Sequence, residues 1–220
     1  MAHPYHHALS SARSFNSTWE KHFPLHSFLD SSKRIFADPR HRALFHNTCA
    51  GEICAHLFPK IPHAREIACQ HIEEDMGQIP TIKDWLPQLP EKIRESFLRS
   101  PILHQKNIEE RLLPLSPFPQ NAQPGLKACL SLLLIPEKID TEMANSSLRI
   151  FYFTAAGPFL CENAFGPILS DGYTPTRYAA EWLIRHPLGF IPSFQDLMSE
   201  IPTEDWMFQK TQKLTPITPA

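Results

Sequence analysis

Two segments of this chain align at a constant offset of 112 residues, and this internal similarity constrains the fold more than any other feature. Residues 65–90 and residues 177–202 share eight identities in 26 positions. Unrelated segments of this composition would share about one or two. The identical pairs are Arg65/Arg177, Ala68/Ala180, Ile72/Ile184, Gly77/Gly189, Ile79/Ile191, Pro80/Pro192, Asp84/Asp196 and Pro90/Pro202. We therefore predict that one structural unit occurs twice in the chain.

The histidines are distributed unequally between the two predicted copies. Ten of the twelve histidines lie in residues 1–71, whereas the second copy holds only His186. We interpret the first copy as the functional one and the second as a degenerate scaffold.

The composition bounds the class of protein. A chain of 220 residues with 20% charged and 42% hydrophobic residues suits one large globular domain or two small ones. A formal net charge of −2 provides no basic field that would attract nucleic acid or anionic lipid. We expect no secretory signal, because the first residues lack a basic segment followed by an apolar one. The sequence has no apolar run that could span a membrane, and the five cysteines form no C-x-x-C pair. These features favour a cytoplasmic protein with free thiols and are compatible with a protein partner.

Frequent proline and scarce glycine predict short helices joined by rigid turns. The chain has 22 prolines and 7 glycines, which argues against a sandwich built on glycine-rich hairpins. We expect an all-α fold of two tandem, divergent helical units packed together. The predicted domains are a His-rich unit at residues 1–90, a Pro-rich connecting segment at 91–125 and a second unit without the histidine cluster at 126–210.

Capping and breaking residues define the expected helices. Asp38 and Pro39 are typical of an N-cap and a first helical position, and Gly77 of a left-handed C-cap. Pro24 is expected to interrupt the helical pattern. Residues 147–153 are rich in residues that suit a strand, but the aligned segment of the first unit favours a helix there. In the first unit helices are expected at about residues 3–15, 25–37, 39–57 and 63–76, with a short one at 81–86.

Histidines and carboxylates of the first unit recur at spacings that place them on one helix face. His3 and His7 are four residues apart, as are His26 and Asp30, and His71 precedes Glu74 by three. Imidazole plus carboxylate is a ligand set for Zn, Mn or Fe, and helical bundles build metal sites from such converging faces. The candidate metal ligands are His3, His7, His26, Asp30, His41, His46 and His71.

Other roles stay open for several polar residues. Asp38 is better explained as a helix cap than as a ligand. Arg40 and Arg42 are either surface charges or partners of Asp30 and Glu74. The histidines most simply assigned to the surface are His22, His56, His63 and His104.

The first 90 residues carry strings that resemble a small bacterial and phage domain family of unknown function. The strings are residues 3–11, His26 with 28–33, Asp38 with 40–44, 70–71 with 74–77, and 79–80 with 84–85. The resemblance covers roughly residues 2–90. The second unit resembles the family only from about residue 156 to 207, through residues 159–162 and 189–193, and it lacks the histidine segments. The resemblance supports the domain boundaries and implies no reaction.

Two functions fit these observations. The first is a non-catalytic binding or regulatory module with a His/Asp polar site in the first unit. The alternative is a metal-dependent enzyme, such as a hydrolase, in which a divalent transition metal held by that cluster activates water. The first is favoured because the chain contains no recognised catalytic motif, and no catalytic or organic-cofactor residue is assigned.

Overall fold

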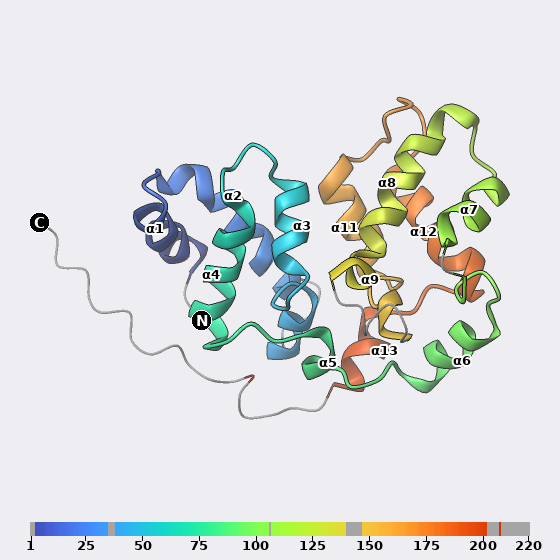
Figure 1. Cartoon of the computed structure of the whole chain (residues 1–220), viewed down its shortest axis with the longest axis horizontal. Helices are drawn as coiled ribbons and strands as arrows, with labels where there is room; N and C mark the ends of the chain where they lie inside the picture. Colours follow the sequence, from blue (N-terminus) through green and yellow to red (C-terminus); the bar gives the residue numbers. More distant parts are fainter. Residues whose placement is uncertain (1–2, 35–37, 106, 140–146, 202–206, 208–220) are drawn as a thin grey trace, which may run out of the picture. The chain divides into compact units, whose positions relative to one another are not determined.

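The computed structural model describes residues 3–34, 38–105, 107–139, 147–201 and 207. Within these ranges every regular element is a helix, and only the isolated bridge between Ile168 and Pro175 has extended pairing (Figure 1). The predicted all-α fold is therefore confirmed. None of the described helices is long and apolar enough to cross a membrane. Residues 202–206 and 208–210, at the end of the predicted second domain, lie outside the described ranges.

The chain divides into two compact units, Met1–Thr81 with Pro202–Ala220, and Ile82–Ile201. The first unit contains α1 (Pro4–Ser14), α2 (Trp19–Leu29), the 3₁₀ helices η1 (Asp30–Arg34) and η2 (Pro39–Leu44), α3 (Ala50–Leu57) and α4 (Ala64–Met76). The second contains α5 (Ile82–Trp85), α6 (Glu91–Arg99), α7 (Ile108–Leu112), η3 (Leu113–Leu115), η4 (Gln120–Ala122), α8 (Gln123–Leu133), α9 (Ile135–Ile139), η5 (Ser147–Ile150), α11 (Ala156–Phe165), α12 (Thr176–Leu188) and α13 (Phe194–Ser199).

Helix α4 is the central element of the first unit. It packs on α3 and also contacts α1 and α2, which pack on each other (Figure 1). Ile67, Ala68, His71, Ile72 and Asp75 form its buried face at helical spacing, so the same stripe carries apolar and polar side chains. The polar members are therefore directed into the interior of the unit.

The helix expected at residues 25–37 is wrong at its start and in its type. Helix α2 begins at Trp19, passes through Pro24 and ends at Leu29, and the chain continues as the 3₁₀ helix η1. An internal proline costs a helix about 3 kcal/mol. Burial of Leu25, Phe28 and Leu29 outweighs it, since each such side chain contributes about 1.5–3 kcal/mol. Residues 35–37 lie outside the described part of the chain.

The continuous helix expected at residues 39–57 is also wrong, although its start signal is correct. Asp38 accepts a hydrogen bond from the backbone N–H of Arg40 and caps η2, which ends at Leu44. The Asn47 amide then donates to the carbonyls of Ala43 and Leu44 at 2.7 and 3.2 Å. Its oxygen accepts from the N–H of Cys49, next to the start of α3. Asparagine competes for backbone groups in this way, so one predicted helix becomes two.

Segments aligned at the offset of 112 have matching local structure in the two units. Helices α4 and α12 are both 13 residues long and start 112 positions apart. Gly77 and Gly189 end them with φ of 73° and 80°, which is the left-handed cap that glycine favours. Of the helix expected at residues 147–153, the structure has the 3₁₀ helix η5 at Ser147–Ile150, and residues 151–153 form turns and a bend. Duplication of the whole unit stays a prediction.

Candidate metal centre

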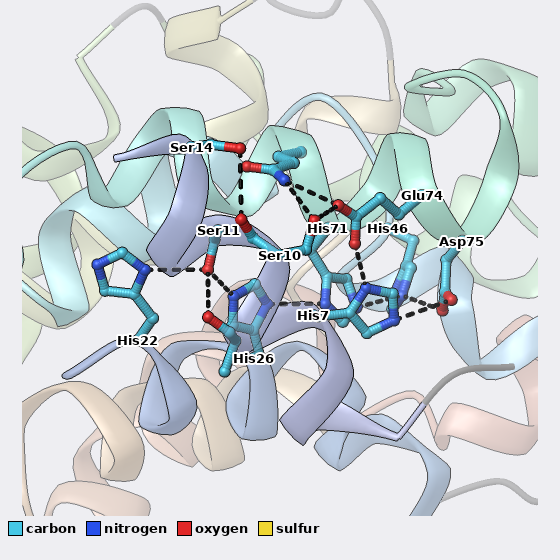
Figure 2. Close-up of polar contacts among 12 residues, drawn as sticks. His7, Ser10, Ser11, Ser14, His22, His26, His46, His71, Glu74 and Asp75 are labelled. Atoms are coloured by element: carbon cyan, nitrogen blue, oxygen red, sulfur yellow. Dashed lines mark hydrogen bonds and ion pairs between the residues drawn. The ribbon is translucent and has the colours of Figure 1, made fainter. Parts of the chain in front are cut away.

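The interior of the first unit contains a dense cluster of ionisable side chains, drawn in Figure 2. Helix α1 provides His7 and Ser11 four residues apart, and α2 provides His22 and His26 at the same spacing. Helix α4 provides residues 71, 74 and 75. Asp30 follows the end of α2, and His46 lies in the turn between η2 and α3.

Four of these side chains offer ligand atoms to one point. One atom each from Asp30, His46, His71 and Asp75 lies within 4.8 Å of the other three. His71 Nε2 is 3.2 Å from His46 Nε2, which is 3.4 Å from Asp75 Oδ2. Two ligands held about 2.1 Å from one ion at the tetrahedral angle are about 3.4 Å apart, so these separations suit a shared cation.

All four side chains of this group, which we call the metal cluster, are buried. Asp30 is 6% exposed, and His46, His71 and Asp75 are at most 1% exposed. Lys33 Nζ forms an ion pair with Asp30 Oδ1, but neither oxygen of Asp30 accepts a hydrogen bond from the described residues. A buried carboxylate normally accepts several hydrogen bonds or binds a metal. The Asp30 carboxylate therefore retains acceptor capacity for a cation.

His7 lies beside the cluster and is the cationic histidine of the site. Its Nδ1 is 2.6 Å from Glu74 Oε2 and its Nε2 is 3.3 Å from Asp75 Oδ1. Burial opposes the charge, but the facing carboxylates of Asp75 and Glu74 raise the pKa of His7 to about 9. Both ring nitrogens then carry protons and face carboxylates, so His7 links the outer Glu74 to the inner Asp75.

The Asp75 carboxylate is the most strongly stabilised anion of the site. Burial raises its pKa, but the facing imidazoles of His46 and His7 lower it more, so the pKa is far below the usual range. Arg42 adds a contact at 3.4 Å from its Nη2 to Asp75 Oδ2, and donates from Nη1 to the carbonyl of Met207. Asp75 is therefore ionised, as a metal ligand must be.

The remaining buried histidines are neutral. Burial lowers the pKa of His26 to about 3 and that of His41 to about 4. Burial also lowers the pKa of His46. The pKa of His71 lies well below its usual value because of burial and of the neighbouring histidines. Neutral imidazoles have a free nitrogen lone pair and can bind a metal.

The structure places the predicted candidates in four kinds of position. His46, His71 and Asp30 are in the metal cluster, and His7 and His26 adjoin it, with His26 Nδ1 3.0 Å from His71 Nδ1. His41 is buried, and its Nδ1 donates to the carbonyl of Asp38 at 2.6 Å. His3 is exposed and acts as the N-cap of α1, since its ring nitrogen accepts from the N–H of Tyr5.

Sequence reasoning missed Asp75 as a member of the cluster. Its signal was the four-residue spacing from His71, which places both on one face of α4. The assignment of His22 to the surface is wrong, since its side chain is only 2% exposed. Its Nδ1 lies 2.9 Å from Ser11 Oγ, and this hydrogen bond satisfies the buried nitrogen. Arg42 is buried and pairs with Asp75, whereas Arg40 pairs with Asp38. His56, His63 and His104 are exposed as predicted.

The aligned positions of the second unit hold no histidine. Leu183 lies 112 positions after His71. Tyr152 and Phe153 lie 106 positions after His46 and Asn47, which is the offset at which residues 154–157 match residues 48–51, Gly157 with Gly51. All three side chains are fully buried. At these sequence positions the second unit buries apolar and aromatic side chains.

Comparison with known proteins identifies one family. Residues 2–94 match the family described as a domain of unknown function (DUF6915), which confirms the expected resemblance to an uncharacterised domain family. The comparison with curated proteins found no match. The comparison with solved structures found none either.

Proposed function

We propose that the first unit binds one divalent transition-metal ion through Asp30, His46, His71 and Asp75. The observation that carries the proposal is the convergence of four buried donor atoms within 4.8 Å. Two imidazoles with two carboxylates suit Zn, Mn or Fe.

Electrostatics favours a cation at this point. Two carboxylates no more than 4.8 Å apart repel each other by at least about 3.5 kcal/mol at an effective dielectric constant of 20. Lys33 and Arg42 offset part of this repulsion through ion pairs with Asp30 and Asp75. An ion bound between the two carboxylates would remove it directly and fill the acceptor capacity of Asp30.

Burial of the cluster supports a binding or regulatory module rather than an enzyme. The ligand atoms lie inside the unit, where a bound ion would hold α2, α4 and the turn before α3 together. Metal that binds only the folded state adds its binding free energy to the stability of the fold. In this proposal the metal organises the first unit, and the function depends on the surface that the unit presents.

The test is the metal content of protein purified without a histidine tag. We expect about one equivalent of Zn, Mn or Fe per chain by elemental analysis, removable by a chelator with a fall in melting temperature. Asp75→Asn should lose most of the metal, because the ligand becomes neutral. His56→Gln, which changes an exposed histidine, should keep it. Metal-free protein that takes up none of these ions on reconstitution would contradict the proposal.

Metal-dependent hydrolysis is the second candidate, and the position of Glu74 favours it. Its side chain is 20% exposed and its carboxylate contacts His7, which contacts Asp75 of the cluster. This arrangement could move protons between solvent and a metal-bound water. The discriminating assay uses metal-loaded protein with chromogenic phosphate and carboxylic esters. Turnover by the wild type that is lost in Glu74→Gln, while the metal is retained, would favour the enzyme. Absence of turnover by the metal-loaded wild type would favour the binding module.

A further inference from the structure

A chain of hydrogen bonds leads away from the metal cluster through three residues that are not among its ligands. His71 Nδ1 is 3.0 Å from His26 Nδ1, and His26 Nε2 is 2.8 Å from Ser11 Oγ. Ser11 Oγ is 2.9 Å from His22 Nδ1 and has a longer contact of 3.3 Å with the carbonyl oxygen of Ala8. Figure 2 shows these contacts as a continuous line from His22 to His71.

We propose that His26, Ser11 and His22 are positioning residues that fix the tautomer of His71 and direct its Nε2 lone pair at the metal. The inference rests on the proposed metal site and assigns His26 to the shell around it. A ligating histidine typically donates its other ring N–H to a partner that orients it. Here that partner is a second imidazole instead of a carboxylate.

Proton counting selects one direction for the chain. Each neutral imidazole has one N–H, and the Ser11 hydroxyl has one proton to donate. If His71 Nε2 binds the metal, its Nδ1–H donates to His26 Nδ1. His26 then carries its proton on Nε2 and donates to Ser11 Oγ, and the Ser11 hydroxyl donates to His22 Nδ1. Every contact in the line is then a hydrogen bond with one donor and one acceptor.

The reverse direction disfavours metal binding. If Ser11 donated to His26 Nε2, the His26 proton would lie on Nδ1 and face His71 Nδ1. His71 would then carry its proton on Nε2, which points at His46 Nε2 and would block the ligand position. The direction of the hydrogen bond between Ser11 and His26 therefore determines whether His71 is ready to bind, and His22 Nδ1 is the nearer of the two acceptors for the Ser11 proton.

Because these residues are buried, the donor and acceptor roles within the hydrogen-bond chain should affect metal affinity strongly. Ser11 and His26 are fully buried and His22 is 2% exposed, so water does not compete freely for their polar atoms. Breaking a hydrogen bond in such a place leaves the remaining group unsatisfied. Loss of an outer partner typically weakens metal binding 10- to 100-fold.

The first test measures binding of Co²⁺ alone to the metal-free full chain, from its visible absorption. Ser11→Ala should raise the Kd about tenfold or more, because His26 loses its acceptor. Ser14→Ala is the matched control on the same helix, since Ser14 only bonds the carbonyl of Ser10. It should leave the Kd unchanged. A Kd for Ser11→Ala within twofold of the wild type would overturn the proposal.

A pair of variants at His22 separates hydrogen bonding from packing. In His22→Asn the amide oxygen takes the place of Nδ1 and can accept from Ser11, whereas His22→Leu cannot accept. We expect His22→Asn to bind Co²⁺ nearly as the wild type does and His22→Leu to bind about tenfold more weakly. If both variants weaken Co²⁺ binding equally, His22 acts through packing, and the proposed hydrogen-bond chain is contradicted.

The second measurement does not require metal. Nitrogen-15 NMR of the metal-free chain should show His71 and His26 as the Nδ1–H and Nε2–H tautomers, and Ser11→Ala should mix the tautomers of both. If the wild-type protein has these tautomers but binds no Co²⁺, the proposed metal site is wrong and the hydrogen-bond chain is still supported. His71 protonated on Nε2 would overturn the chain itself.

Discussion

The buried and partly buried ionisable groups around the metal cluster show how neighbours determine the protonation state of histidine. His7 is a cation because both its ring nitrogens face carboxylates, while His26 is neutral because burial dominates its surroundings. His22 is likewise neutral, with a pKa lowered by burial and by Lys21. The same imidazole therefore serves as a cation and as a neutral hydrogen-bonding group within one helical unit.

At the residue scale, these states predict how the stability of the metal-free protein depends on pH. His26 and His41 have pKa values lowered from 6.5 to about 3 and about 4, so below pH 6.5 the unfolded chain binds protons that the folded chain does not. Each should reduce the free energy of unfolding by about 1.4 kcal/mol per pH unit as the pH falls from about 6 toward its folded value.

His7 changes the free energy of unfolding with pH in the opposite direction. Its pKa is raised from 6.5 to about 9, so its contribution is complete below pH 6.5 and is lost as the pH rises through 9. Urea unfolding from pH 4.5 to 9.5 in the presence of a chelator should therefore give a maximum near pH 6.5–7. His26→Gln should reduce the acid slope by about one proton. A flat profile between pH 7 and 5 would contradict the neutral state of these histidines.

At the same scale, the sequence indicated part of the site and missed the rest for a physical reason. Spacing along one helix identified His71 with Glu74 and His26 with Asp30, because such pairs share a face. Spacing does not state which residues of different helices meet, so the contact of His46 with Asp75 could not be found. His3 was misplaced because a histidine at a helix start can also cap the helix, as it does for α1.

At the scale of the element, helix ends with a dedicated backbone conformation were predictable and internal breaks were not. Gly77 ends α4 as expected, since a left-handed φ of 73° suits glycine. Pro24 was read as a breaker, but packing of α2 overrides its local preference. The break after Leu44 depends on the side chain of Asn47, which bonds two carbonyls that a continuing helix would have used.

Two glycines at aligned positions near helix starts should respond differently to alanine. A Cβ at Gly157 would lie 2.4 Å from the carbonyl oxygen of Tyr152 and 2.6 Å from Leu133 Cδ2. Backbone cannot yield easily, so Gly157→Ala should cost about 1–3 kcal/mol or more. A Cβ at Gly51 would lie 3.0 Å from Arg65 Cγ, part of an exposed, flexible side chain.

Gly51→Ala should therefore be nearly neutral, because the better helix propensity of alanine, about 1 kcal/mol, offsets a small shift of Arg65. Chemical denaturation of the two variants gives the comparison. If both variants are destabilised equally, the close approach of Tyr152 and Leu133 is not the reason that glycine is needed at position 157.

At the scale of the whole molecule, the first unit buries a cluster of histidines and carboxylates, whereas the histidines of the second unit, His104 and His186, are exposed. Helices α4 and α12 keep the same length and the same cap, yet one buries His71 and Asp75 and the other buries Leu183. This pattern supports the proposal that a duplicated unit kept its scaffold and lost its site in the second copy. It predicts one metal ion per chain.

The substitution His71→Leu tests this assignment directly, because it gives α4 the residue that α12 carries at the aligned position. We expect the helical circular dichroism to persist and the metal content to fall from about one equivalent to below about one tenth, since the variant removes a ligand atom. The unpaired nitrogens left on His26 and His46 should cost about 1–3 kcal/mol. Ile72→Val is the matched control at the next buried position. It should lose about 0.5–1.5 kcal/mol and keep its metal.

The reciprocal variant Leu183→His should not create a second site. Its new imidazole would be buried without a carboxylate or a second histidine at the aligned positions, where Tyr152 and Phe153 are buried instead. A buried polar group without partners is destabilising, so the variant should unfold at lower urea concentration while its metal content stays near one. A second equivalent of metal in Leu183→His, or full metal content in His71→Leu, would show that the ion binds outside the first unit's cluster. A single equivalent that disappears only with His71 would place the metal function in the histidine-rich copy and leave the second copy a structural role.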